Sequence, residues 1–382
     1  MRRVTAAVLA AVIGVPSVAC APTGPDGTIT TPTTTKIPTT TTTPTSTTTT
    51  KAPTTTTIAP PPPSTTTTVP AVGPFSMAVI GDAPYGPDQT SPTAMPRLVS
   101  SINGAPGVSL AVHLGDIKDG ASECSNQYFA GIKAQFDTFV DPLVFTPGDN
   151  EWADCHKPSA GGYLPTERLD TLRSTFFVTP GATLGRTRRA VTSQASSPGY
   201  AAYRENVRWE DAGVVLTTVN LPGSNNGSLP WFSAAGQIST PALVAAQSAE
   251  VQQRSAAANR WLNETFDRAT SIGAPAVVLF TQADMFSSTS GAAGVSGYAS
   301  VVSTLASRAA AFNRPVLLMT GDSHAFRVTK PLATPNTLYP GLTTVAPLLT
   351  QVVVEGEQTT EWLEITIDPR AVQPFSWIRR TA

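Results

Sequence analysis

Four glycine–aspartate pairs constrain the fold of this chain more than any other feature of its sequence. Each pair follows a short apolar run that is typical of a buried strand. Glycine allows the backbone to turn sharply where a strand ends, so we expect the four aspartates to project beyond the carboxyl edge of a sheet. The pairs are Gly81-Asp82, Gly115-Asp116, Gly148-Asp149 and Gly321-Asp322.

Four carboxylates gathered at one sheet edge repel one another and are costly to remove from water. A positive partner placed among them offsets both effects. The sequence therefore predicts that one or two metal ions bind at this edge.

Residues 1–20 are predicted to be a secretory signal peptide, because Arg2 and Arg3 precede the apolar run Val8 to Val15. Cys20 follows at once, and this end of the segment resembles the bacterial lipobox, in which the cysteine becomes the acylated first residue. The serine three places before Cys20 is atypical, so simple cleavage near Ala19 is the alternative. No other stretch is long and apolar enough to span a bilayer.

Residues 21–71 are dominated by threonine and proline. Such a tract buries too little apolar surface to offset its chain entropy, and we expect a disordered, extended linker. Residues 72–382 are enough for one large domain. The predicted protein is extracytoplasmic, either secreted or lipid-anchored to the bacterial cell envelope, with the N-terminal anchor as its only membrane contact.

Charge and cysteine content narrow the class of protein further. The 382-residue chain has a formal net charge of −1 and no basic cluster, which disfavours specific recognition of nucleic acid. If Cys20 is acylated, Cys124 and Cys155 remain as a pair and form a disulfide in an oxidising compartment. The alternative is two unpaired buried thiols. The sequence carries no signal for an oligomeric state.

Hydrophobic periodicity predicts strands and helices in the order βαβαβ, then strands, then mixed elements. This order indicates an α/β (α+β) fold in which sheets pack together with helices outside. We expect strands at 77–80, 107–115, 142–146, 203–209, 214–219, 276–280, 315–320, 348–354 and 361–367, helices starting at Ser91-Pro92 and at Thr166, helices at 124–140, 240–271 and 298–312, and a loop at 180–199.

The segments around the glycine–aspartate pairs resemble the calcineurin-like metallophosphoesterases. The signature of that family is D-x-H, G-D-x-x-D, G-N-H-D/E, a strand-borne histidine and G-H-x-H. The resemblance covers most of residues 75–330, and it implies a two-sheet β-sandwich flanked by helices with metals at the carboxyl ends of the strands. The matching segments are Asp82-Ala83-Pro84, Gly115-Asp116-Ile117-Lys118-Asp119, Gly148-Asp149-Asn150-Glu151 and Gly321-Asp322-Ser323-His324.

The resemblance implies that Asp82 binds a first metal and that Asp116 bridges two metals. Asp149 falls on the ligand asparagine of the family in a gapless alignment, and Asn150 then falls on its catalytic histidine. A shift by one residue makes Asn150 the ligand asparagine instead. His324 matches the last histidine of the final motif, and Asp322 replaces the first.

Two further positions depart from the signature. Gln282 lies near the place of the strand-borne histidine, and Pro84 stands where the first motif has its histidine. Tyr85, next to Pro84, is a candidate to supply a phenolate ligand. The whole chain holds only three histidines, so the implied ligand set is rich in oxygen. Hard oxygen ligands favour manganese, magnesium or calcium over zinc or iron.

The implied activity is hydrolysis of a phosphomonoester or phosphodiester, and the substrate is a small molecule or a surface group. Divalent metal ions, expected to be two, would activate the attacking water. Because Asn150 replaces the catalytic histidine, another proton donor is needed. His156 is a candidate if a disulfide at Cys155 holds it near the site, and an ordinary loop histidine otherwise. The alternative function is that of a non-catalytic member of the family, a cell-surface binding protein.

Three nearby features have structural interpretations. His113 lies in a strand three residues before Asp116, and we expect its side chain to point away from the metals. Asp119 is expected to cap the following helix. Asn225-Asn226-Gly227 is typical of a turn, although its place after a strand also allows it to line the pocket.

Overall fold

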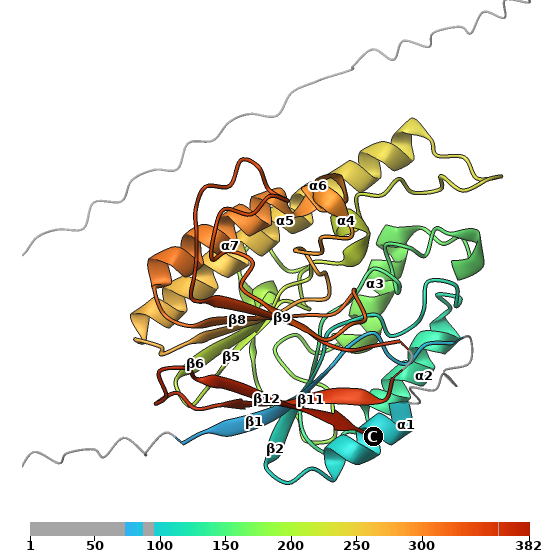
Figure 1. Ribbon diagram of the computed structural model, residues 1–382. Coiled ribbons are helices and arrows are strands. Elements are labelled where there is room, and N and C mark those ends of the chain that lie inside the picture. The colour runs from blue at the N-terminus through green and yellow to red at the C-terminus, as the bar shows by residue number, and fades with distance from the viewer. Residues whose placement is uncertain (1–72, 87–94, 358) are drawn as a thin grey trace, which may run out of the picture. The chain divides into compact units, whose positions relative to one another are not determined.

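The computed structural model of the chain describes residues 73–86, 95–357 and 359–382. The predicted signal peptide, Cys20, the linker and the helix start at Ser91-Pro92 lie outside these residues. The described part is a two-sheet β-sandwich flanked by helices (Figure 1), which is the fold class that the sequence predicts.

The two sheets are mixed, and each contains a run of parallel strands. The five-stranded sheet has the order β12-β11-β1-β2-β3, and β1, β2 and β3 are parallel. The seven-stranded sheet has the order β4-β5-β6-β7-β8-β10-β9, and β6, β7, β8 and β10 are parallel. The strands are β1 (Phe75–Ile80), β2 (Val108–His113), β3 (Leu143–Phe145), β4 (Thr192–Ser193), β5 (Val207–Asp211), β6 (Val214–Thr218), β7 (Val277–Phe280), β8 (Val316–Thr320), β9 (Arg327–Thr329), β10 (Leu349–Val353), β11 (Glu361–Ile367) and β12 (Phe375–Thr381).

The central parallel strands are apolar on both faces because both faces are covered. Met77 and Val79 of β1 belong to the same buried cluster as Val278 of β7 and Leu317 of β8, so this cluster forms the core between the sheets. The alternate residues of β1 point outward to a second cluster beneath helices. The two sheets therefore pack face to face across this cluster.

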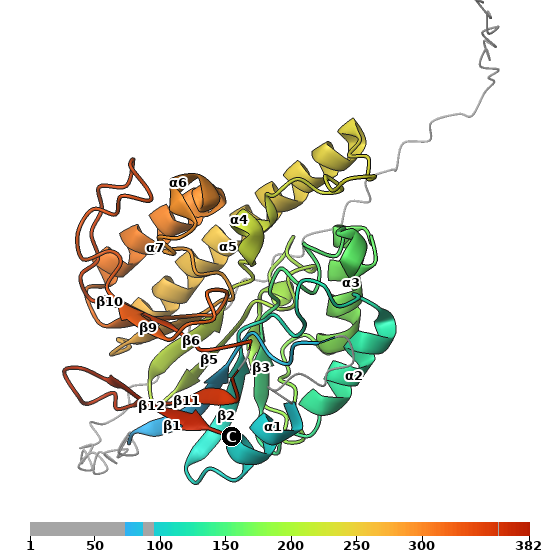
Figure 2. The ribbon, with the colours of Figure 1, turned by 45° about the vertical axis from the view of Figure 1, so that its right-hand side comes forward.

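Helices cover the outer faces of the sandwich (Figure 2). Helices α1, α2 and α3 share a buried cluster with β1 to β3, and α5 and α7 share one with β6, β7 and β8. The helices are α1 (Met95–Asn103), α2 (Asn126–Phe136), α3 (Pro165–Phe176), α4 (Gly223–Gly227), α5 (Pro241–Ser271), α6 (Gly291–Gly294) and α7 (Ala299–Phe312), with 3₁₀ turns η1 (Pro158–Ala160), η2 (Gln194–Ser196) and η3 (Ser296–Tyr298).

A few expected elements differ in the structure. The helix expected to be capped by Thr166 begins at Pro165, which occupies the first turn, and Leu164 is the preceding residue. The segment 180–199, expected to be a loop, contains β4 and η2. β9 and β12 were not expected. β12 is an edge strand that pairs along its length with β11, so tertiary pairing rather than its own pattern makes it a strand.

The predicted disulfide between Cys124 and Cys155 is confirmed, with Cα atoms 5.9 Å apart. It links the segment before α2 to the loop that follows β3. Such bonds are typical of proteins in oxidising compartments. Within the described ranges, no helix is long and apolar enough to cross a membrane.

Candidate metal centre

The structure brings the four glycine–aspartate pairs together at one edge of the sandwich. Asp82 follows β1, Asp116 follows β2, Asp149 follows β3 and Asp322 follows β8. The first three strands are parallel neighbours in one sheet, and β8 is an interior strand of the other. The carboxyl ends of parallel strands lie at the same edge, where ligands commonly bind in open α/β sheets.

Several residues of this edge have an uncommon backbone conformation. The φ angle is +52° at Asp82, +54° at Asp116, +67° at Asp322 and +53° at His324. Residues other than glycine seldom adopt this left-handed region, and such residues cluster at functional sites. This observation indicates that the turns are shaped to direct these side chains rather than only to reverse the chain.

The glycine of the third pair is required by close packing. A Cβ atom on Gly148 would lie 2.6 Å from the main-chain nitrogen of Asp116 and nearer still to its carboxylate. No side chain fits there. The loops after β2 and β3 can therefore approach each other only with glycine at this position, and this approach brings Asp149 next to Asp116.

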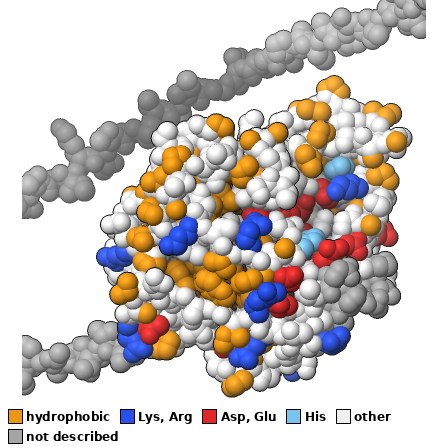
Figure 3. Space-filling model, viewed as in Figure 1, with side chains coloured by type: hydrophobic (Ala, Val, Ile, Leu, Met, Phe, Trp, Pro, Cys, Tyr) orange, Lys and Arg blue, Asp and Glu red, His pale blue; other side chains and the backbone are white. Residues whose placement is uncertain are grey.

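Two groups of potential metal ligands share Asp116. The first triad consists of Asp82, Asp116 and His324, and the second triad consists of Asp116, Asp149 and Asp322. In each triad the candidate ligand atoms lie within 4.8 Å of one another. Figure 3 shows acidic and histidine side chains gathered on this face of the molecule.

His324 is oriented toward the first triad by a carboxylate behind it. Its Nδ1 lies 3.1 Å from Oε2 of Glu357, and its Nε2 lies 3.5 Å from Oδ1 of Asp82. Burial lowers the pKa of His324, but Asp82 and Glu357 outweigh this effect and raise it to about 9. A carboxylate on one ring nitrogen is the usual arrangement behind a histidine that binds a metal through the other.

Tyr85 lies against the first triad. Its hydroxyl is 3.0 Å from His324 Nε2 and donates to Oδ2 of Asp116 at 3.4 Å. Burial raises the pKa of the Tyr85 phenol well above its usual range, and the charges of Asp116 and Asp82 raise it further. The phenol therefore keeps its proton unless a cation approaches it.

The second triad is contacted by neutral hydrogen-bond donors. The Gln282 amide nitrogen lies 3.1 Å from Asp116 Oδ2, 3.1 Å from Asp149 Oδ1 and 3.3 Å from Asp322 Oδ1. Ser224 Oγ donates to Asp149 Oδ2 at 2.6 Å.

The carboxyl groups of the second triad have perturbed pKa values. Burial, with repulsion from Asp154, raises the pKa of Asp149 to about 6. Burial, with repulsion from Asp149 and Asp82, raises the pKa of Asp322 to about 8. Neutral donors thus leave much of the charge of this triad uncompensated.

Asn150 and Asp149 both reach Asp116 from the loop after β3. The Asn150 main-chain N–H donates to Asp116 Oδ1 at 3.2 Å, and its side-chain amide donates to Asp116 Oδ2 at 3.1 Å. The carboxylate of Asp149 belongs to the second triad. Both residues therefore lie at the candidate centre, and which of them is the ligand stays a prediction.

His113 is a structural residue, as expected. It is fully buried, and its Nδ1 accepts a hydrogen bond from the Gly115 N–H at 3.1 Å. Its Nε2 donates to the Ala83 carbonyl oxygen at 2.7 Å. Burial lowers the pKa of His113 to about 4, so the ring is neutral at pH 7 and holds the turn that carries Asp82.

His156 and Asp119 have other partners. His156 Nδ1 accepts the Phe232 N–H at 3.0 Å. Across the described ranges, no hydrogen bond or ion pair joins the His156 ring to either triad. Asp119 accepts the N–H groups of Ala121 and Ser122, so it caps a turn. The expectation that it caps the following helix is wrong, because Ser125 caps α2. The role of His156 as a proton donor stays a prediction.

The first triad fits a divalent cation by the chemistry of its donors. Two carboxylates and an imidazole converge, and Glu357 holds the other ring nitrogen. Mostly oxygen ligands suit manganese or magnesium. The second triad has the carboxylates for a cation, but an amide N–H₂ group points into it.

Sequence reasoning missed two residues of this site. Glu357 lies beyond the end of β10, and Ser224 lies in α4, beyond the end of β6. A signal was present for both, because β6 and β10 are parallel strands whose carboxyl ends lie at the same edge as the glycine–aspartate pairs. Neither residue stands next to a glycine–aspartate pair, so the motifs do not point to them.

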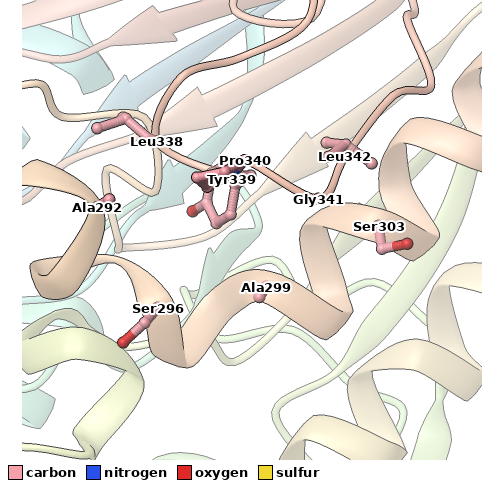
Figure 4. A pocket seen from close by; sticks show the side chains of 9 residues that line it. All are labelled: Ala292, Ser296, Ala299, Ser303, Leu338, Tyr339, Pro340, Gly341 and Leu342. Carbon is pink, nitrogen blue, oxygen red and sulfur yellow. The ribbon is translucent and has the colours of Figure 1, made fainter.

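A separate pocket of about 260 Å³ lies between the start of α7 and the loop at 338–342 (Figure 4). Its lining is small or apolar and contains no carboxylate or histidine, so it is not part of the metal centre. Ser296 lines this pocket and accepts a hydrogen bond from Asn225, the neighbour of Ser224. α4 therefore contacts both the metal centre and the wall of the pocket.

Comparisons with known proteins do not assign a family. No family model matches the chain, and no curated protein sequence matches it. Among solved structures, it is similar to the GAP50 anchor in the inner membrane complex of Plasmodium, with 8% identity and a TM-score of 0.36 over 81% of this chain and 89% of that one.

Two further structural matches are enzymes. One is purple acid phosphatase PPD1 from yellow lupin (Lupinus luteus) seeds, with 11% identity and a TM-score of 0.38 over 81% of this chain and 54% of that one. The other is a 5'-nucleotidase precursor from Thermus thermophilus, with 10% identity and a TM-score of 0.38 over 80% of this chain and 54% of that one. Similarities this distant assign no activity to the chain.

Proposed function

We propose that the protein is an extracytoplasmic, calcineurin-like metallophosphoesterase that hydrolyses a phosphomonoester or a phosphodiester. The observation that supports this most strongly is the sharing of Asp116 by two triads of ligand atoms at the ends of parallel strands. A carboxylate in that position can hold two divalent cations at a fixed spacing. Such cations activate a water for attack on phosphorus and stabilise the charge of the phosphoryl group.

The residues of the chain have distinct roles in this proposal. Asp82, Asp116 and His324 bind one cation, with Tyr85 as a further oxygen ligand. Asp149 and Asp322 extend the centre from Asp116, with Asn150 and Gln282 beside them. Asn150 donates a hydrogen bond toward the centre but carries no proton that it can release. Proton transfer to the leaving group therefore falls to another group, for which His156 is the candidate of this chain.

A non-catalytic binding protein is the alternative, and a specific observation favours it. Pro84 occupies the place of one expected histidine and Asn150 that of another. A domain with these replacements could retain a cation for binding or stability alone. The convergence of four buried or half-buried carboxylates, each costly to desolvate, supports the catalytic proposal.

Two observations support the location proposed for the protein. The disulfide between Cys124 and Cys155 supports an oxidising compartment. The N-terminal segment supports export, with lipidation at Cys20 as the anchor. The substrate is then a small-molecule or surface phosphoester, and no specific recognition of nucleic acid is proposed.

The test is hydrolysis by the purified protein after chelator treatment and reloading with manganese, magnesium, calcium or zinc. Chromogenic phosphomonoester and phosphodiester substrates are compared in wild type, Asp116→Asn and Asp170→Asn. The control replaces an aspartate whose side chain is 80% exposed. We expect metal-dependent turnover that Asp116→Asn lowers at least about a thousandfold and that Asp170→Asn leaves unchanged.

Two outcomes reject the enzyme. Folded protein that turns over neither substrate with any metal supports the binding protein. Turnover that survives Asp116→Asn shows that the hydrolysis observed does not come from this centre.

A further inference from the structure

We propose that the two triads bind metal unequally: the first holds a resident divalent cation, and the second accepts one only after the Gln282 amide turns over. The inference rests on the proposed function only in that it concerns the same metal centre. It concerns the affinity and order of metal binding, which are measured without turnover.

The orientation of the Gln282 amide is determined at both ends. Its Oε1 accepts the main-chain N–H of Gly223, while its Nε2 lies within 3.3 Å of carboxylate oxygens of Asp116, Asp149 and Asp322. An amide oxygen can only accept and an amide nitrogen can only donate. The reverse orientation would set oxygen against three carboxylates and N–H₂ against N–H.

This orientation opposes a cation in the second triad. The two amide hydrogens are shared among the three carboxylates that a cation would need, and they carry positive partial charge toward its position. Turning the amide over directs Oε1 to the cation, but it leaves the buried Gly223 N–H facing a second donor. An unsatisfied buried donor costs free energy comparable to that of a hydrogen bond.

The main chain at Gly223 lies directly against the carboxylates of the second triad. A Cβ atom there would lie 2.8 Å from Asp149 Oδ1 and 2.8 Å from Asp322 Oδ1. The next three residues, at 224–226, form a left-handed turn with φ angles of +50°, +54° and +61°.

All three side chains of that turn are held by other parts of the domain. Ser224 donates to Asp149 and Asp154, Asn225 accepts the Gly297 N–H, and Asn226 bonds Arg254. Movement of Gly223 away from the second triad would break these contacts. The amide of Gln282 is therefore the part that must rearrange.

The first triad needs no such rearrangement. The groups beside it are the Tyr85 hydroxyl, 3.0 Å from His324 Nε2, and the Asn150 amide, which donates to Asp116 Oδ2 at 3.1 Å. A hydroxyl oxygen can donate or accept by rotating its proton. Among the described residues no hydrogen bond fixes the Asn150 amide oxygen, so that amide can turn without leaving a buried donor unpaired. Glu357 already holds the far nitrogen of His324. A cation that binds here displaces protons, and the amide beside it has no main-chain N–H to leave unpaired when it turns.

The amide is neutral, so the carboxylates of the second triad still attract a cation. Binding there is weakened rather than abolished. The lost hydrogen bonds and the opposed donors correspond to an affinity that is about ten- to a hundredfold lower than that of the first triad.

The test counts manganese. Full-length protein is loaded with Mn²⁺, passed through a desalting column and analysed for bound metal, and free Mn²⁺ is followed during a titration. We expect wild type to retain one ion per chain and to bind a second at least about tenfold more weakly. Gln282→His presents an imidazole nitrogen in place of the amide, and we expect it to retain two.

Gln194→His is the matched control. Gln194 is also fully buried, but it bonds Ala257 and Asn206 rather than the metal centre. We expect this variant to retain one ion. Gln282→Glu, which supplies a carboxylate ligand, is the second test should the histidine variant fold poorly.

Three results would overturn the inference: two ions of equal affinity in wild type, one ion in both folded Gln282 variants, or no ion in wild type. One retained ion in wild type and two in Gln282→His would support it even if no phosphoester were hydrolysed. That combination of results would reject the proposed phosphoesterase activity but support unequal metal binding by the two triads. Failure of the proposed function can therefore be distinguished from failure of this inference.

Discussion

The two triads share Asp116 and are built on the same kind of strand end, yet their surroundings differ. Behind the first triad, Glu357 orients His324 so that a ring nitrogen faces the carboxylates. Within the second, Gln282 directs hydrogens at the carboxylates. Glu357 thus favours a cation at the first triad, whereas Gln282 competes with a cation at the second.

This difference shows that the number of carboxylates does not measure the capacity of a site for metal. The second triad has three carboxylates and the first has two. What distinguishes them is that the Gln282 amide at the second triad is held in place by Gly223, whereas His324 of the first triad is oriented by Glu357. Hydrogen-bond partners around the ligands thus decide which site binds metal more tightly.

The largest effect should come from breaking each triad in turn. His324→Ala removes the imidazole of the first triad, whereas Asp322→Asn keeps an oxygen that can still accept from Gln282. We expect phosphoester hydrolysis to fall at least about a hundredfold in His324→Ala and about tenfold in Asp322→Asn. Initial rates at saturating manganese measure both effects.

The proposed difference between the triads would be wrong if Asp322→Asn lowered hydrolysis more than His324→Ala. In that case the second triad would carry the cation that matters for turnover. His113→Gln is not a suitable control, because His113 holds the turn that carries Asp82. Asp170→Asn is again the control for handling and folding.

A second test uses the stability of the protein without metal. The pKa of Asp322 is raised to about 8 by burial first, and then by Asp149 and Asp82. The folded metal-free protein therefore keeps a proton that the unfolded chain releases near pH 4, and its stability falls as pH rises toward 8. Between about pH 6.5 and 8.5 we expect its melting temperature to fall by about 5 °C.

Manganese should largely remove this pH dependence, because the cation compensates the carboxylates that protons otherwise neutralise. Asp322→Asn should also weaken it in the metal-free state. Thermal unfolding with chelator and with Mn²⁺ at several pH values measures both effects. A melting temperature that rises with pH in the chelated protein would contradict the assignment of a protonated cluster.

The resemblance to the calcineurin-like metallophosphoesterases implied the two-sheet sandwich, and the glycine–aspartate pairs predicted the meeting of the carboxylates. Runs such as 77–80 and 316–320 are apolar on both faces and end in glycine–aspartate, which marks buried parallel strands whose ends lie at one edge. The disulfide followed from counting cysteines. The meeting of the carboxylates and the disulfide depend on local patterns and on counting, so one sequence was enough for them.

The remaining features depend on how separate segments pack. Glu357 reaches His324 only because β10 and β8 are neighbours in one sheet. The turn at 224–227 has a local signature in Asn225-Asn226-Gly227, but the contacts of Ser224 with Asp149 and Asp154 depend on packing between separate segments. β12 is a strand because β11 pairs with it, and its ion pairs Arg379–Glu361 and Arg380–Glu364 span that pairing.

The smallest effect tests the support behind the first triad. Glu357 is half-exposed, so its charge is screened, and its main value is to accept the Nδ1 proton of His324. Glu357→Gln keeps an acceptor and should weaken binding of the first Mn²⁺ only about threefold, whereas Glu357→Ala removes it and should weaken binding about tenfold. Glu355→Gln is the control, since Glu355 accepts the Phe326 N–H instead. Manganese titration separates these values, and equal losses in the Gln and Ala variants would show that Glu357 acts through its charge rather than by orienting the ring.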